Sequence, residues 1–183
     1  ATARRIRGNG DQPHTTMLIN ASERVQYHFD LWPLVRNIVL DIRSKIVQNG
    51  IIRAELESQW KDETLRVPAS DFGNEHVDFD LIWSDLLATI DLLGPLNGAN
   101  HDSNENCGII VDNSGAEIRL AYSDEEPRPI IVIGGSTLSR GLTLEGLVCS
   151  VFARSTKLYD SLLQMGRWFG YRRGYEDLPR VWM

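Results

Sequence analysis

Two segments of the chain are apolar without interruption over the length of a β-strand. One is IIVIGG at 130–135 and the other is LVCSVFA at 147–153. An unbroken apolar run of this kind is typical of a strand that is buried on both faces, and such strands belong mainly to parallel sheets covered by helices. The sequence therefore predicts an α/β fold with a mainly parallel sheet.

Helical stretches and shorter strand-like runs alternate with these two segments. Apolar residues recur at three- and four-residue spacing between Ser22, a suitable N-cap, and Gln48, so a helix is expected there. Pro33 lies in its interior and is expected to kink or split it. The remaining expected elements are strands at 17–22, 108–113, 116–122 and 179–183 and helices at 51–63, 78–93 and 157–169.

A length of 183 residues suits a single domain. Residues 1–15 are rich in arginine, glycine and polar side chains, and we expect a linker or disordered segment there. The domain itself is expected to cover 16–183. Because the chain starts without Met and ends in an apolar strand, the sequence is interpreted as a piece of a longer polypeptide.

The composition is that of an ordinary globular protein, with 42% hydrophobic and 24% charged residues. No apolar run approaches the ~18 residues of a membrane-spanning helix, and no apolar stretch follows the first arginines as in a secretory signal. Two cysteines, Cys107 and Cys149, are too few for a disulfide framework or a four-cysteine zinc site. We therefore expect reduced thiols, a cytoplasmic location and no membrane partner.

The net charge of −6 is divided unevenly along the chain. Residues 1–127 carry −10 and residues 128–183 carry +4, and seven of the eight positive residues in the second part are arginines. Arginine is preferred where a planar guanidinium meets phosphate, so this part is compatible with phosphate contacts. A solvated basic surface has the same composition, and charge alone does not distinguish the two.

A glycine-rich segment at 134–146 directly follows the strand expected at 130–135. Its glycines let the backbone approach a ligand, and Ser136, Thr137 and Arg140 offer hydroxyl groups and positive charge to a phosphate. It is not a Walker A loop, because the Gly-Lys-Ser/Thr ending is missing. A tight turn that needs glycine only for its geometry is the structural alternative.

A second segment, QMGRWFGYRR at 164–173, lies at the end of the helix expected at 157–169. It brings Gln164, Arg167, Arg172 and Arg173 into a short span. Phosphoryl transfer needs positive charge at the γ-phosphate, which an arginine finger delivers. The alternative is a basic helix end, because arginine near a helix C-terminus also suits the helix dipole.

Taken together, these segments resemble superfamily-two helicases. IIVIGGSTLSRGLTLEG is similar to motif V, ARSTKLYDSLLQMGRWFGYR to the segment that runs into motif VI, and MLINAS to the strand of motif IV. More closely, SRGLTLEGL followed by YDSLLQMGRWFGYRRGYEDLPR resembles the bacterial Z-one domain, an endonuclease-labelled domain found beside helicase-type ATPase lobes. The close match covers about 130–183, and 49–127 would be a family-specific helical and loop insertion.

The resemblance implies a RecA-like three-layer domain of the P-loop NTPase class, the second lobe of an ATP-dependent helicase-like hydrolase. ATP and Mg²⁺ would be held mainly by a first lobe of the same polypeptide, and nucleic acid, in particular DNA, would be the partner. This chain alone is expected neither to bind ATP tightly nor to hydrolyse it. The resemblance implies a catalytic role for Arg167 as arginine finger, for Arg172 and for Gln164, nucleotide contacts for Arg140, Gly141 and Arg173, and nucleic-acid contacts for Ser136, Thr137 and Ser22.

Two other functions stay open at this point. A metal-dependent endonuclease needs converging carboxylates, and acids and histidines cluster at 75–80 (Glu75, His76, Asp78, Asp80) and at 101–107 (His101, Asp102, Glu105, with Cys107). Solvated acids or a helix start explain both clusters equally well, and no metal is predicted. The other alternative is a degenerate RecA-like module that only binds nucleic acid or a partner.

Overall fold

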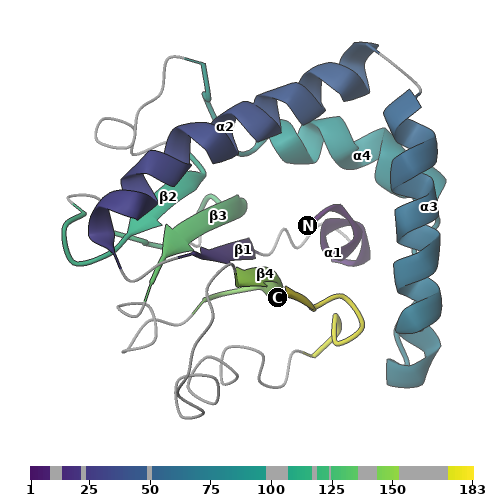
Figure 1. Cartoon of the computed structure of the whole chain (residues 1–183). Coiled ribbons are helices and arrows are strands. Elements are labelled where there is room, and N and C mark those ends of the chain that lie inside the picture. The colour runs from purple at the N-terminus through teal and green to yellow at the C-terminus, as the bar shows by residue number, and fades with distance from the viewer. Residues whose placement is uncertain are drawn as a thin grey trace.

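In the computed structural model, five strands form one sheet in the order β2-β3-β1-β4-β5, and every neighbouring pair is parallel (Figure 1). The structure describes residues 1–8, 14–21, 24–48, 51–97, 107–116, 119–123, 125–135, 144–152 and 173–183. The strands are β1 (Thr15–Asn20), β2 (Ile109–Asp112), β3 (Pro129–Gly134), β4 (Leu147–Phe152) and β5 (Arg180–Trp182). The helices are α1 (Thr2–Arg7), α2 (Val25–Gln48), α3 (Ile51–Arg66), the short 3₁₀ helix η1 (Ala69–Phe72) and α4 (Phe79–Asp91).

This architecture confirms the predicted α/β class and is consistent with a RecA-like three-layer fold. The two continuous apolar runs become β3 and β4, which lie on either side of β1. Leu18 in the middle of β1 pairs in register with Val132 and with Ser150, and all three are fully buried. The central strand therefore has no exposed face, as its apolar sequence requires.

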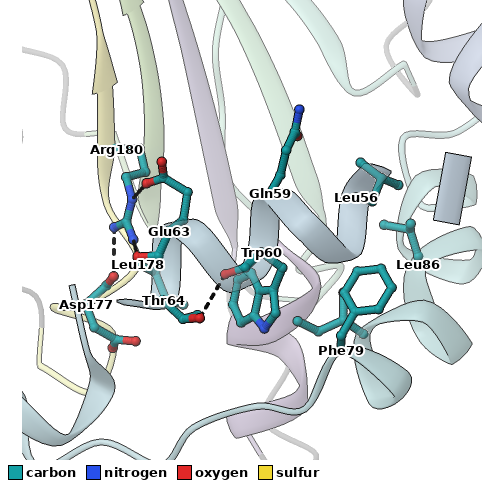
Figure 2. Close-up of a pocket in the computed structure, with 11 residues that line it drawn as sticks. Leu56, Gln59, Trp60, Glu63, Thr64, Phe79, Leu86, Asp177, Leu178 and Arg180 are labelled. Atoms are coloured by element: carbon teal, nitrogen blue, oxygen red, sulfur yellow. Dashed lines mark hydrogen bonds and ion pairs between the residues drawn. The ribbon is translucent and has the colours of Figure 1, made fainter. Parts of the chain in front are cut away.

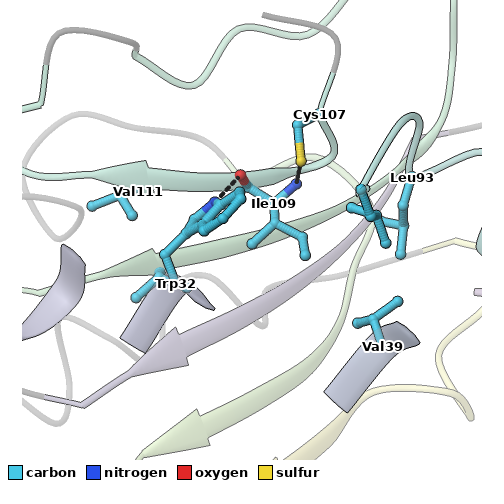
Figure 3. Packing of buried hydrophobic residues seen from close by; sticks show 8 residues of the cluster. Trp32, Val39, Leu93, Cys107, Ile109 and Val111 are labelled. Carbon is cyan, nitrogen blue, oxygen red and sulfur yellow. Dashed lines mark hydrogen bonds between the residues drawn. The ribbon is translucent and has the colours of Figure 1, made fainter. Parts of the chain in front are cut away.

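Helix α2 packs on one face of the sheet (Figure 1). Trp32 is 2% exposed, and its indole Nε1–H donates to the carbonyl of Ile109 at 2.8 Å (Figure 3). Val39, about two helical turns further along, continues the same buried cluster with Val111 and Leu93. The expected helix is confirmed as one continuous element through Pro33, so the predicted split does not occur.

The opposite face of the sheet carries a second buried cluster. Its members include Leu18, Val132 and Ile130 from the strands, together with Leu120 and Leu144 from the connecting segments. Residues 119–123 form no strand, so the strand expected at 116–122 is wrong for the part that is described. The remaining expectation of a helix at 157–169 lies outside the described residues.

The beginning of the chain differs from the expected linker. Residues 2–7 form α1, and Thr2 and Ala3 are buried against Val77 and Ile82 of the α4 region. The prediction of a loose segment over 1–15 is therefore wrong for this helix. The prediction relied on the high content of arginine and glycine. In the structure, however, the arginines of α1 contact neighbouring acids and an aromatic ring.

The segment 49–127 is not wholly an insertion. It contains α3, η1 and α4, but it also contains β2, which pairs along its whole length with β3 and so belongs to the central sheet. Helices α3 and α4 lie toward the side from which the strands start (Figure 1). No helix in the described part combines the length and the apolar character needed to cross a membrane.

The hydrogen bond from Trp32 to the sheet yields a first testable prediction. Trp32→Phe removes the indole donor, leaves the Ile109 carbonyl without that partner and opens a small cavity, so it should lower the free energy of unfolding by about 2–3 kcal/mol. Urea denaturation measures this. The control is Tyr27→Phe on the same helix, where a ring that is 47% exposed loses only its hydroxyl and the change should stay within about 0.5 kcal/mol. Equal effects of the two changes would contradict the packing described.

Candidate functional site

Four parallel strands end at one edge of the sheet, and we call this the carboxyl edge. Its residues are Asp112, Gly134, Asn20 and Phe152, which are the last residues of β2, β3, β1 and β4. Asn20 lies in register with both Gly134 and Phe152, and Asp112 lies in register with Gly134. In open α/β sheets ligands bind outside the carboxyl ends of the strands, so this edge is the candidate site.

Most of the predicted site residues lie outside the described part of the chain. These are Ser22, Ser136, Thr137, Arg140, Gly141, Gln164, Arg167 and Arg172. The strands that lead into them are described, however. The chain leaves β3 at Gly134 and β4 at Phe152, on the two sides of β1 and at the same edge. The two segments that carry the predicted motifs therefore both start at the carboxyl edge.

Buried polar groups hold the turn after β2 against the start of α2. The side-chain amide nitrogen of Asn113 lies 3.2 Å from Nδ1 of His28, and both residues are almost fully buried. The amide oxygen of Asn113 accepts a hydrogen bond from the backbone of Gly115 at 2.8 Å. A side chain at Gly115 would press on Val25 at 3.0 Å, so the turn packs closely on the first residue of α2.

Asp112 is the most deeply buried acid at the carboxyl edge, with no exposed surface. Its Oδ2 accepts a hydrogen bond from the backbone N–H of Leu120 at 2.9 Å, and Nε of Arg119 lies 2.9 Å from its Oδ1. The Arg119 contact is an ion pair without well-aligned hydrogen-bond geometry. Sequence reasoning missed both residues. The sequence feature that could have indicated Asp112 is an acid at the carboxyl end of an apolar strand.

Arg173 is the one predicted site residue that the structure describes. It is exposed, and it makes no hydrogen bond or ion pair to any other described residue. Two residues later, the ring of Tyr175 lies 4.1 Å from the guanidinium of Arg4, which donates to the carbonyl of His14 just before β1. Arg173 therefore lies toward the amino ends of the strands. The expectation that all the arginines share the edge of the glycine-rich segment is not met by Arg173.

Ion pairs from two helices hold the segment that follows Arg173. Arg7 of α1 donates to both carboxylate oxygens of Asp177, at 2.6 and 2.8 Å, and Asn74 donates to Asp177 at 2.8 Å. Burial by itself raises the pKa of Asp177, but the hydrogen bonds from Arg7 and Asn74 and the charge of Arg7 outweigh it, so the pKa is lowered. Arg180 donates through Nε to one carboxylate oxygen of Glu63 in α3 and through Nη2 to the backbone carbonyl of the same residue.

A pocket of about 290 Å³ lies between α3, α4 and the segment 177–180 (Figure 2). Its walls are mostly apolar, with Leu56, Trp60 and Phe79 on the helices, and the Arg180–Glu63 pair lies at one end (Figure 2). None of the four described residues that mark the carboxyl edge lines it. The pocket is therefore separate from the carboxyl edge.

The acids of the first cluster considered for a nuclease, at 75–80, do not converge on a metal site in the described part of the chain. Among the described residues, no group of three histidine, cysteine or carboxylate side chains is placed to hold a metal ion. Asp80 pairs with Arg53, which occupies the carboxylate with a cation of the chain itself. Of the second cluster, only Cys107 is described; it is buried beside Ile109, and burial raises the pKa of its thiol.

Asp177 yields a second prediction. The charged form of Asp177 is favoured in the folded chain, so its contribution to stability is present above the ordinary aspartate pKa of about 3.9 and is lost as the pH falls through the lowered pKa. Asp177→Asn should cost about 2 kcal/mol near pH 7, and the difference from the unchanged chain should shrink in acid. Urea denaturation at a series of pH values measures this.

The matched control is Asp91→Asn, which weakens the exposed pair between Asp91 and Arg43. An exposed ion pair contributes less than about 1 kcal/mol, so this change should have a small effect at every pH. A loss from Asp177→Asn that does not depend on pH would contradict the role given to its charge.

Comparison with known proteins agrees with the fold and adds a family. No curated protein and no solved structure matches the chain. A family model does match, over the whole of residues 1–183, and its description is the Z1 domain. With an all-parallel sheet, a polar carboxyl edge and a family match along its full length, this chain belongs to the Z1 domain family.

Proposed function

We propose that this Z1 domain is the second RecA-like lobe of a helicase-like ATPase. It would act with a first lobe elsewhere in the polypeptide, which would hold ATP and Mg²⁺ through Walker A and Walker B motifs. Hydrolysis would drive movement along nucleic acid, in particular DNA, or its remodelling. The proposal assigns the chemistry to the pair of lobes and not to this domain alone.

One observation carries the proposal. The glycine-rich segment and the arginine-containing segment follow β3 and β4, and both strands end beside β1 at the carboxyl edge. A motif V-like segment and a motif VI-like segment thus follow the two strands that flank β1 in a parallel sheet, and the resemblance implies that these segments share one edge of that sheet. A chance likeness of two short segments carries no such constraint on strand order.

The residues of this chain would contribute charge and orientation. Arg167 would place a guanidinium at the γ-phosphate as that phosphate leaves, with Arg172 and Gln164 beside it, and Arg140 and Gly141 would line the nucleotide side of the cleft. Ser136, Thr137 and Ser22 would contact the nucleic-acid backbone. Arg173, which is exposed and not paired with a described carboxylate, fits a phosphate contact chemically, although it lies away from the carboxyl edge.

A third prediction tests this assignment in a polypeptide that contains both lobes. Arg167→Ala should lower ATP turnover on the order of 10³-fold or more with little loss of ATP binding, because an arginine finger stabilises charge that develops only in the transition state. Steady-state ATPase assays and nucleotide-binding titrations measure the two effects. The isolated domain should show no turnover.

The control for this experiment is Arg43→Ala, which removes an arginine that is paired with Asp91 on the far part of α2 and should leave turnover unchanged. Unchanged turnover in Arg167→Ala would favour a module that only binds. DNA cleavage that needs Mg²⁺ but no ATP would instead favour the endonuclease alternative. Either result would contradict the proposal.

A further inference from the structure

Arg119 differs from the other described arginines in how it is held. Its Nε lies 2.9 Å from the carboxylate of Asp112, which has no exposed surface, whereas its own side chain is 51% exposed. No other hydrogen bond or ion pair joins Arg119 to the described residues. The Arg119 side chain is therefore held beside a buried carboxylate, and about half of it is open to solvent.

The connection after β2 does not need Arg119 for its closure. The next residue, Leu120, returns the chain to the sheet by burying its side chain in the cluster around Leu18 and Val132. Its backbone N–H also donates to Asp112. With Leu120 in place, the ion pair to Arg119 adds a defined position for a cation. The carboxylate of Asp112 is buried, so this ion pair also balances its charge, and about half of the Arg119 side chain nevertheless stays exposed.

The position of this cation is the carboxyl edge. Asp112 is in register with Gly134, where the glycine-rich segment begins, and Gly134 is in register with Asn20. The turn at 113–115 packs on Val25, so the amino-terminal end of α2, with its positive dipole, opens on the same edge. The Arg119 side chain is 51% exposed, and the planar fork of donors on a guanidinium matches the oxygens of a phosphate.

We propose that Arg119, anchored by Asp112 at the carboxyl edge, is a phosphate-binding residue of this domain. It rests on the proposed function for its ligand class, because the phosphate would come from a nucleic-acid backbone or from a nucleotide. The two sources share the same chemistry at the guanidinium. The experiment separates them by using two probes.

The test uses the whole 183-residue chain, with a fluorescent single-stranded oligonucleotide as one probe and a fluorescent ATP analogue as the other. Arg119→Ala should weaken binding of one probe about tenfold, and for the oligonucleotide it should reduce the slope of log affinity against log salt by about one. The matched control is Arg43→Ala. Arg43 is 43% exposed and paired through Nε with Asp91, but it lies 18 residues after Val25, about 27 Å along α2. Its loss should change affinity by less than about twofold.

Asp112→Asn separates a positioned guanidinium from charge alone. The change makes the domain less negative, so general electrostatic attraction predicts tighter binding of either probe. Anchoring by Asp112 predicts weaker binding, because the Asn side chain keeps an acceptor for Leu120 but loses the ion pair with Arg119. Circular dichroism and urea denaturation establish that each variant is folded.

Each outcome decides. Weaker oligonucleotide binding in both Arg119→Ala and Asp112→Asn assigns the phosphate to nucleic acid, and weaker binding of the ATP analogue alone assigns it to a nucleotide. Binding that Arg119→Ala leaves unchanged overturns the role of Arg119 but not the proposed function. If the unchanged chain binds neither probe, the phosphate contact is overturned. The turnover of Arg167→Ala in the two-lobe polypeptide still tests the ATPase assignment separately.

Discussion

The parallel pairing of β1 with β3 and β4 is the constraint on which the rest of the structure depends. It buries Leu18 and Val132 completely, and it brings the ends of three strands to one edge in fixed register. Parallel strands need long crossover connections. The chain therefore leaves each strand at this edge and crosses to the opposite edge before the next strand begins. Whatever chemistry the loops perform, their starting points are set by the burial of a few apolar side chains.

Buried carboxylates connect the loops to this frame. Asp112 holds the connection after β2 at the carboxyl edge, and Asp177 holds the segment before β5 against α1 and Asn74. A buried carboxylate is costly without partners. The partners of Asp112 come from the connection that directly follows its own strand, and those of Asp177 come from segments far away in the sequence. A buried, paired carboxylate thus holds a connecting segment at each end of the sheet, and at the carboxyl edge it also holds the exposed Arg119.

The sequence predicted the strands and helices of the core better than the polar contacts that hold the connecting segments. Unbroken apolar runs identified β3 and β4, and helical spacing identified α2, because burial on both faces of a sheet leaves a direct mark on composition.

Sequence-based prediction failed at α1, where arginines that were interpreted as a loose basic tail are paired with Asp177 and Asp85. It also failed at Asp112 and Arg119. Their partnership spans a turn, and periodicity carries no information about which polar groups meet across a turn. The resemblance located the motif segments by sequence, but only the structure showed that the two strands before them end at one edge.

The central claim is that this domain binds its ligands at the carboxyl edge, where β3 and β4 end. Hydrogen exchange of the two-lobe polypeptide, with and without an oligonucleotide and a non-hydrolysable ATP analogue, tests it most directly. The account predicts slower exchange on ligand binding at the amides that follow Gly134, Asp112 and Phe152, with the pocket between α3 and α4 unchanged. Protection confined to α3, α4 and the segment 177–180, with none at the carboxyl edge, would contradict it.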